Sequence, residues 1–245
     1  MTHTTQNLPQ QVFIRRHSVL TRVAHWVNVV CLTLLLMSGL QIFNAHAALY
    51  WGNISTFEHP LALIGPFPAW ATIPSYQDLA SGRLWHFFFA WVFVINGVVY
   101  LFASLLSRHL LDDLVPTLSE TKRIGPSLIA HIQLRFPKGE EARHYNVIQK
   151  LTYLVVIFGL LPLVILTGLS MSPRLDADFQ WLPQLFGGRQ SARTMHFVAA
   201  SGLVAFTLIH VIMVLVSGVR NNLRSMITGH YAIDMESTDA KAIHH

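Results

Sequence analysis

A hydrophobic stretch near the C-terminus, residues 195–219, constrains this chain most, because it contains no Lys, Arg, Asp or Glu. A run of that length is typical of a helix that crosses a membrane. It contains two histidines, His196 and His210. Fourteen residues of α-helix rise about 21 Å and turn about 1400°, which is about 40° short of four full turns. Both imidazoles are therefore expected on one face of the helix, at two depths in the membrane.

An imidazole ring in hydrocarbon is unfavourable unless it is hydrogen-bonded, binds a metal or faces a wet cavity. We interpret the two histidines as ligands of haem iron at two levels. Between them lie small residues, Ala199–Gly202, which would let a flat macrocycle approach the helix. The alternative is that both rings are hydrogen-bonded to neighbouring helices, and this stretch by itself leaves that alternative open.

The composition identifies an integral membrane protein, because 52% of the residues are hydrophobic and only 12% are charged. Soluble domains carry about a quarter charged residues. The sequence pI of 9.7 does not indicate nucleic-acid binding, since the basic residues flank apolar runs and form no stripe among exposed aromatic residues. The single cysteine, Cys31, lies inside an apolar run, which excludes a disulfide framework, a thiolate metal site and an iron–sulfur cluster within this chain.

The fold class expected is all-α: one membrane domain over residues 1–245, built as a four-helix bundle. Apolar runs predict helices at about residues 23–43, 84–107, 148–172 and 194–219. Outer loops at 44–83 and 173–193, a cytoplasmic loop at 108–147 and a polar tail at 220–245 connect or follow them, and residues 1–12 are expected to be frayed. The first run also matches a cleaved signal peptide. We favour a membrane helix, because the run is long for a signal core and contains His25-Trp26.

The distribution of basic residues predicts the orientation. Thirteen of the seventeen Lys and Arg residues lie in the N-terminal segment, the 108–150 connection and the C-terminal tail. Cytoplasmic segments are enriched in Lys and Arg, so these three segments and both termini are expected in the cytoplasm. The first and third helices then run outward, and the second and fourth run inward.

This topology pairs the histidines. His86 and His196 each begin a helix that enters from outside, so they share the outer depth. His25 begins a helix that enters from the cytoplasm. His210 lies about 21 Å beyond His196 on the fourth helix, at the same inner depth as His25. Two sites with two histidines each result. Six-coordinate haem suits them, since both axial positions are filled. Zinc or copper would require further ligands, and the predicted spans supply no acidic residue or cysteine at these levels.

Three of the four histidines follow an arginine by three residues, and these arginines are Arg22, Arg83 and Arg193. One helical turn from a ligand, a guanidinium would be placed to bind a haem propionate at the membrane interface. The alternative is that each arginine extends toward lipid phosphate.

Two glycines support the same arrangement. Gly39 lies fourteen residues after His25, and Gly97 lies eleven after His86, so each is near its histidine's face at the depth of the other site. Glycine there leaves room for a porphyrin edge. Packing of small residues between helices is the alternative.

The start of the third helix contains a polar cluster, made of Tyr145, Asn146, Gln149 and Lys150. A plain interpretation makes Asn146 the N-cap and Lys150 an interfacial anchor. A functional interpretation places amide and ammonium donors beside the inner site, where a quinone carbonyl would accept hydrogen bonds. The remaining histidines, His46 and His59 among them, lie in loops or tails and are expected to be solvated.

Together these residues resemble the cytochrome b membrane subunits of bacterial nickel–iron hydrogenases and of formate dehydrogenase and related molybdenum enzymes. The resemblance covers about residues 15–230, and its carriers are Arg22-Val-Ala-His25-Trp26, Ser38-Gly39, Arg83-Leu-Trp-His86, Tyr145-Asn146-Val-Ile-Gln149-Lys150, His196 with His210, and Met226-Ile-Thr-Gly229. The chain departs from hydrogenase relatives in having no second histidine just before His196, and its 44–82 loop is longer than in formate dehydrogenase relatives.

The resemblance implies two b haems, an outer one on His86 and His196 and an inner one on His25 and His210. It also implies a site for menaquinone or ubiquinone around Asn146, a bacterial inner-membrane location, and a periplasmic oxidoreductase catalytic subunit docked on the outer side. We predict a di-haem cytochrome b that transfers electrons between the quinone pool and that oxidoreductase, which we expect to be a molybdopterin enzyme.

Two rival functions remain. One is a stand-alone membrane cytochrome b acting on quinone and a small oxidant such as superoxide. The other is a histidine-based metal transporter or haem shuttle, which would need acidic residues or open coordination within the membrane. For the outer loop we expect docking of the partner through Trp51 and Trp70, because rigid apolar area with little charge is typical of a stable interface. An aromatic belt on the lipid headgroups is the alternative.

Overall fold

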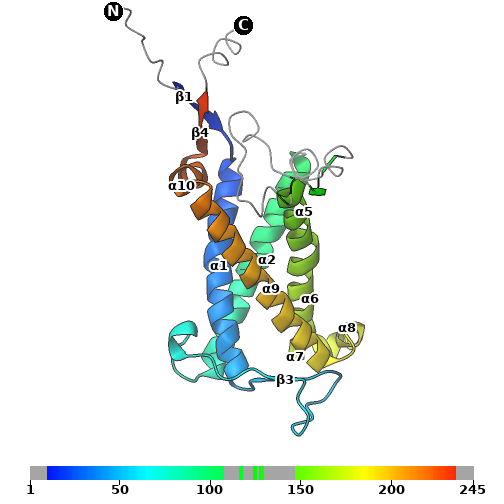
Figure 1. Cartoon of the computed structure of the whole chain (residues 1–245). Helices are drawn as coiled ribbons and strands as arrows, with labels where there is room; N and C mark the ends of the chain where they lie inside the picture. The colour runs from blue at the N-terminus through cyan, green and yellow to red at the C-terminus, as the bar shows by residue number, and fades with distance from the viewer. Residues whose placement is uncertain are drawn as a thin grey trace, which may run out of the picture.

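The computed structural model describes residues 10–107 and 147–235, together with positions 116, 117, 124, 125, 127 and 129 between them. Four helices long and apolar enough to cross a membrane lie in these ranges, which confirms a multi-pass helical membrane protein. They run between the same two ends of the molecule (Figure 1). The spans are α1 (Val19–Asn44), α2 (Leu79–Leu106), the joined elements α5, η4 and α6 (Val147–Ser170), and α9 (Arg189–Val216).

Three of the helices, α1, α2 and α9, begin about a turn earlier than the apolar runs, and in α1 and α2 a polar side chain caps the added turn. Ser18 accepts a hydrogen bond from the Thr21 N–H at the start of α1. Asp78 does the same for α2, accepting from the N–H and the hydroxyl of Ser81, and these bonds lower the pKa of the Asp78 carboxyl. Hydropathy detects only the part of a helix that faces hydrocarbon, so it misses such capped turns.

The third span is divided by its proline. After α5 (Val147–Val155) the chain makes the π-helical turn η4 (Val156–Leu160), and α6 (Leu161–Ser170) begins with Pro162 in its first turn. Proline has no backbone N–H and its ring collides with the preceding turn, so a locally wider turn accommodates it.

The four spans pack as two helix pairs, α1 with α2 and α6 with α9, and the close backbone contacts are concentrated within each pair. In the first pair, the Asn96 amide nitrogen donates to the Asn28 side chain (2.8 Å) and to the Ala24 carbonyl (3.0 Å). Where the η4 turn of the third span meets α9, a Cβ on Gly202 would lie 3.4 Å from Leu160, so glycine there permits close approach. Contact across the two pairs therefore depends on side chains.

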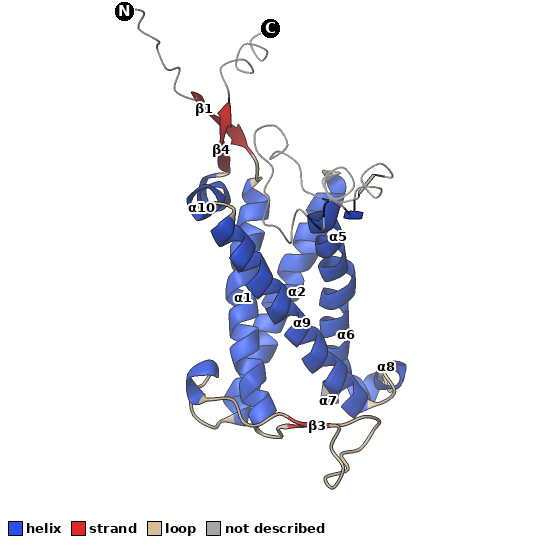
Figure 2. Ribbon diagram, viewed as in Figure 1, coloured by secondary structure: helices blue, strands red, loops and turns tan. Residues whose placement is uncertain are grey.

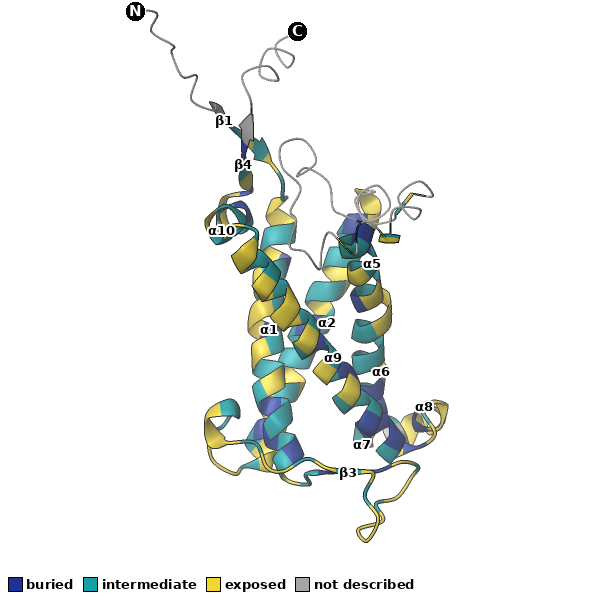
Figure 3. Cartoon of the chain, viewed as in Figure 1, coloured by how far each residue is buried: buried dark blue, intermediate teal, exposed yellow. Residues whose placement is uncertain are grey.

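The outward faces of the helices are apolar and exposed, as the yellow residues along α1 and α2 show (Figure 3). On α2 the exposed side chains include Phe88, Trp91, Ile95 and Phe102. An apolar surface of this extent is unfavourable in water and suits contact with lipid.

A two-stranded ribbon at the end that carries both termini differs from the all-α prediction (Figure 2). Strand β1 (Gln10–Arg15) pairs antiparallel with β4 (His230–Met235), and its first three residues belong to the segment expected to be frayed. The predicted polar tail also contains α10 (Val219–Thr228), which precedes β4. The hydropathy pattern predicted neither the ribbon nor α10. The ribbon forms by pairing between the two ends of the chain, which a local pattern does not show.

Met226–Gly229 joins this ribbon to the first helix. The Trp26 indole N–H donates to the Met226 carbonyl at 3.1 Å, and Arg22 donates to the Ile227 carbonyl. The Arg16 N–H donates to the Gly229 carbonyl at 2.8 Å. The motif that carried part of the family resemblance therefore holds α1 to the segment that follows α9.

The opposite end is covered by the 45–78 loop, with strands β2 (Ala48–Leu49) and β3 (Ala62–Leu63) and the short helix η1 (Ala69–Ala71). The short helices α7 (Pro173–Asp178) and α8 (Trp181–Leu185) precede α9. No side chain caps α9; instead the Gly52 carbonyl accepts from the N–H groups of Gln190 (2.9 Å) and Ser191 (3.2 Å). The loop thus replaces a helix cap and is fixed one turn from His196.

Gly229→Ala is expected to weaken the junction of α1 and α10. Gly229 has φ +88°, and an added Cβ would lie 3.0 Å from the His17 carbonyl oxygen. The left-handed conformation costs an L-residue about 1–2 kcal/mol, so the thermal midpoint of the solubilised protein should fall. Gly65→Ala is the control, because a Cβ there meets no heavy atom within 4 Å. Equal midpoints for the two variants would contradict the role given to Gly229.

Candidate functional site

The structure brings the four predicted histidines together in two pairs, each joining one helix pair to the other. His86 of α2 faces His196 of α9, with ring centroids 6.2 Å apart and ring planes at 65°. His25 of α1 faces His210 of α9, with centroids 6.2 Å apart and planes at 63°. The pairing is the one predicted from helix geometry and topology. We refer to these as the outer pair and the inner pair.

The separation within each pair fits two axial ligands on one metal. A metal–imidazole bond is about 2 Å and the ring centroid lies about 1.2 Å beyond the nitrogen, so a metal between two rings sets their centroids about 6.4 Å apart. The observed 6.2 Å is close to this value. Since the helix pairs make few close backbone contacts with each other, the residues present fit a flat group bound between them.

The hydrogen bonds of the outer pair determine which nitrogen of each ring is available. Ser38 Oγ lies 2.6 Å from the Leu34 carbonyl oxygen and 3.1 Å from His86 Nδ1. A hydroxyl has one proton and a carbonyl can only accept, so Ser38 donates to Leu34 and accepts from the Nδ1–H of His86. The other ring nitrogen, Nε2, then carries the lone pair that a metal requires.

Thr167 repeats this arrangement on the other helix pair. Its hydroxyl lies 2.6 Å from the Leu163 carbonyl oxygen and 3.1 Å from His196 Nδ1. By the same proton count, His196 carries its proton on Nδ1 and presents Nε2. Both outer rings are therefore held in the metal-binding tautomer by hydroxyls that are fully buried.

Glycines allow these rings to approach the neighbouring helices. A Cβ on Gly39 would lie 3.4 Å from His86 Cε1, and one on Gly168 would lie 3.2 Å from His196 Cε1. The sequence predicted that Gly39 lies at the depth of the outer site, although its helix carries His25 of the inner site. In the structure Gly39 lies against His86 of the outer pair. At Gly97 a Cβ would meet no heavy atom within 4 Å, and the role of this glycine beside a porphyrin edge stays a prediction.

Aromatic rings surround the inner pair. Phe206 stacks on His210 with centroids 6.1 Å apart, and the Trp26 ring meets His25 edge-on at 5.5 Å. Within the described ranges no hydrogen bond fixes either inner imidazole. The two pairs therefore share one spacing but differ in what holds their rings.

The three predicted arginines differ in their contacts. Arg22 donates to the Ile227 carbonyl, while Arg193 donates to the carbonyls of Ala48 (2.7 Å) and His46. Arg83 is exposed, with its guanidinium 5.6 Å from the centroid of the Phe87 ring. Arg22 and Arg193 thus connect segments that are distant in the sequence. Binding of haem propionates by the three arginines stays a prediction.

Two residues of the outer site escaped the sequence reasoning, Thr167 and Gly168, and Ser38 was noted only as part of a family motif. A signal existed: a hydroxyl residue followed by glycine occurs in both the first span, as Ser38-Gly39, and the third, as Thr167-Gly168. In the part of the chain that the structure describes, no group of three or more His, Cys, Asp or Glu side chains gathers at one place.

His46 was expected to be solvated, and the structure corrects this. Its ring stacks on Tyr50 at 5.4 Å and meets Phe57 edge-on at 5.5 Å, and its Nε2 atom is buried. The residue belongs to the packed base of the outer loop. His59 is exposed, as predicted.

The predicted quinone residues are described only in part. Tyr145 and Asn146 lie outside the described residues. Gln149 is half-buried and Lys150 is 6% exposed, both in the first turn of α5. From this turn an aromatic line leads to the inner pair, because Tyr153 meets Phe206 edge-on at 6.4 Å and Phe206 stacks on His210.

The chain is similar in sequence to a known protein family and to a named bacterial protein. The family model described as "Prokaryotic cytochrome b561" matches residues 16–229. A protein of Azospira oryzae named "Putative protein-methionine-sulfoxide reductase subunit YedZ1" is 32% identical over 216 residues, which is 87% of this chain and 96% of that protein.

Replacing any one of the four paired histidines by alanine should remove or convert one low-spin b centre and leave the other. The change leaves an axial position without a nitrogen donor, so six-coordination is lost at that level only. Redox titration of each variant's optical spectrum measures this, with His59→Ala as the exposed control. A normal two-centre spectrum in His210→Ala would refute the inner pairing.

Proposed function

The chain belongs to the prokaryotic cytochrome b561 family, and from this membership we propose that it is a di-haem b-type cytochrome that transfers electrons between the membrane quinone pool and a periplasmic oxidoreductase. The observation that carries the proposal is the presence of two histidine pairs with one spacing, both shared by α9. Membership implies binding of b-type haem. Two pairs at opposite ends of a span supply axial ligands for two haems.

The roles of the chain's residues follow from their contacts. Haem iron, when bound, takes up and releases single electrons without binding substrate, because both axial positions are filled. Ser38 and Thr167 hold the outer imidazoles with Nε2 available. Charge distribution supports cytoplasmic termini and an inner-membrane location, with the outer pair near the periplasm.

The quinone site belongs beside the inner pair, at the start of α5. Three features support it: the polar residues Gln149 and Lys150 on the first described turn, the nearly full burial of Lys150, and the aromatic contact from Tyr153 through Phe206 to His210. An ammonium and an amide at this position would donate hydrogen bonds to quinone carbonyls. Protons would come from the cytoplasmic surface, because the described spans contain no Asp or Glu.

The periplasmic partner is proposed from the relative's name and from the outer loop. The Azospira oryzae protein is named as a subunit of a protein-methionine-sulfoxide reductase, and the match covers nearly its whole length. We propose a partner of that class here, a reductase of the molybdopterin type, which receives electrons from the outer haem.

Asn146→Leu and Lys150→Leu should each keep both haems and slow reduction of the inner haem by a quinol analogue by about tenfold, because each removes a hydrogen-bond donor to the quinone. Stopped-flow spectroscopy measures the rate. Thr152→Val on the same helix is the control, since its exposed hydroxyl bonds only its own backbone, at the Ile148 carbonyl. Unchanged rates in both leucine variants would leave Asn146 as a cap and Lys150 as an anchor.

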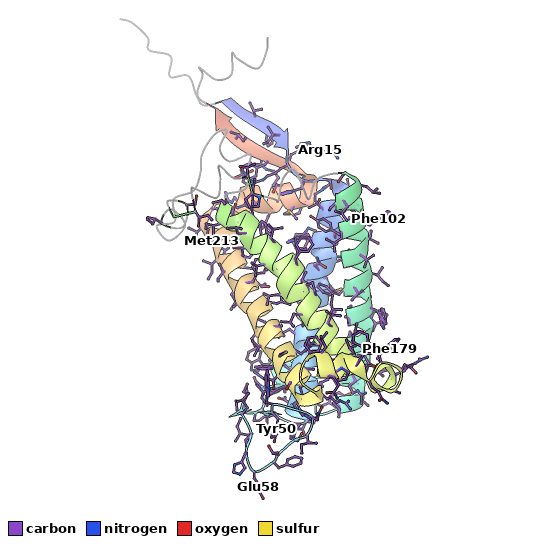
Figure 4. The ribbon with its side chains drawn as sticks, turned by 90° about the vertical axis from the view of Figure 1, so that its right-hand side faces the viewer. Arg15, Tyr50, Glu58, Phe102, Phe179 and Met213 are labelled. Atoms are coloured by element: carbon purple, nitrogen blue, oxygen red, sulfur yellow. The ribbon has the colours of Figure 1, made fainter. Side chains whose placement is uncertain are left out.

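The outer loop projects beyond the helices. Glu58, labelled in Figure 4, lies at its far end, beyond Tyr50. Near this tip Ile54 is 72% exposed and Phe57 is 77% exposed. Apolar side chains projecting away from the bundle are unfavourable in water and favour a protein partner over lipid headgroups.

Replacing Trp51 and Trp70 by serine should release the copurifying oxidoreductase and leave both haem spectra intact. These residues are 60% and 82% exposed, so their removal takes contact area from the partner and little from the fold. Trp181→Ser is the matched control, because Trp181 is 63% exposed on the same side but belongs to α8. A disturbed outer haem with the partner retained would instead indicate an aromatic belt.

A further inference from the structure

We propose that Ser38 and Thr167 are positioning residues, whose hydroxyl groups act on the outer haem through its histidines. They increase the electron density at the iron, so the reduction potential of the outer haem is lower than in a chain without these hydroxyls. The inference rests on the proposed function, since it requires a haem between His86 and His196. It concerns residues that do not touch the metal.

The hydrogen bonds of Ser38 and Thr167 run in the same direction. Each hydroxyl gives its one proton to a backbone carbonyl at 2.6 Å and accepts from a histidine Nδ1–H at 3.1 Å. A hydroxyl that is itself donating is a stronger acceptor, because consecutive hydrogen bonds polarise one another. Both outer imidazoles therefore share their Nδ1 proton with a good acceptor.

Such a hydrogen bond changes the donor strength of the ring nitrogen that would bind the metal. Partial removal of the Nδ1 proton gives the ring imidazolate character and makes Nε2 a stronger electron donor. A stronger donor stabilises ferric over ferrous iron, so the potential falls. Because both histidines of the outer pair have such a contact, the two effects would add at one haem.

The inner pair differs from the outer pair in its hydrogen bonds. In the described part of the chain neither His25 nor His210 has a hydrogen-bond acceptor at its ring, although their spacing equals that of the outer pair. The hydroxyls therefore act on one haem only. An outer haem of lowered potential is a better reductant for a partner on that side.

The two hydroxyls also orient the outer rings. Ser38 of α1 holds the ring of its neighbour α2, and Thr167 of α6 holds the ring of its neighbour α9, so each anchor acts within one helix pair. Gly39 and Gly168, next in sequence to the hydroxyl residues, leave the space that each ring occupies. The angle of 65° between the outer rings is thus fixed by each pair separately, and the electron paramagnetic resonance signal of ferric haem reports such an angle.

The experiment compares Ser38→Ala, Thr167→Val and the double variant with the unaltered chain, and the outer haem is identified as the one lost in His86→Ala. At a fixed ambient potential, the ratio of reduced to oxidised outer haem should rise about threefold in each single variant and about tenfold in the double. For a one-electron couple, tenfold corresponds to about 59 mV. The inner haem should titrate as before, and the resonance signal of the outer ferric haem should change.

Thr33→Val and Thr152→Val are matched controls, because both threonines donate only to a carbonyl of their own helix, at 2.8 Å. Thr167→Ser keeps a hydroxyl acceptor, so its outer haem should have the potential of the unaltered chain. This variant tests the inference even if the double variant binds haem poorly. An unchanged outer potential in Thr167→Val with both haems present would overturn the inference. An unaltered chain that holds fewer than two haems would instead overturn the proposed function.

Discussion

The architecture depends on four imidazoles that are half-buried between two helix pairs. Close backbone contacts run within α1–α2 and within α6–α9, so side chains place α9 against the first pair. The two histidine pairs are among these contacts, and Phe197 of α9 also packs on Phe43 of α1. An imidazole in a water-poor interior needs a partner. A haem on each pair would satisfy all four rings and join the helix pairs, so cofactor binding and assembly of the bundle are one process in this account.

The ends of the bundle keep this arrangement in register. On the side of the termini, Met226–Gly229 receives Arg22 and Trp26, one turn before and one residue after His25. On the opposite side, Gly52 caps α9 and Thr194 donates to the Tyr50 carbonyl at 2.7 Å, two residues before His196. Each histidine site is thus fixed by a loop or tail from a distant part of the sequence.

The sequence predicted what helical periodicity and hydropathy control. The pairing of His25 with His210 and of His86 with His196 followed from a rise of about 1.5 Å per residue and from the alternation of helix direction. It did not predict β1 and β4, because their pairing joins segments more than two hundred residues apart that have no apolar pattern. It missed Thr167 because a hydroxyl in an apolar helix normally bonds its own backbone, and the Thr167 hydroxyl bonds the Leu163 carbonyl and His196 together. His46 was misjudged because its burial depends on the fold of the outer loop.

The central claim is that one chain binds two b haems, each between two histidines. The most direct test is the haem-to-protein ratio of the purified chain, determined together with the electron paramagnetic resonance spectrum of its oxidised form. The account predicts two haems per chain and two low-spin ferric signals. One haem per chain, or a high-spin signal showing a missing axial ligand, would contradict it.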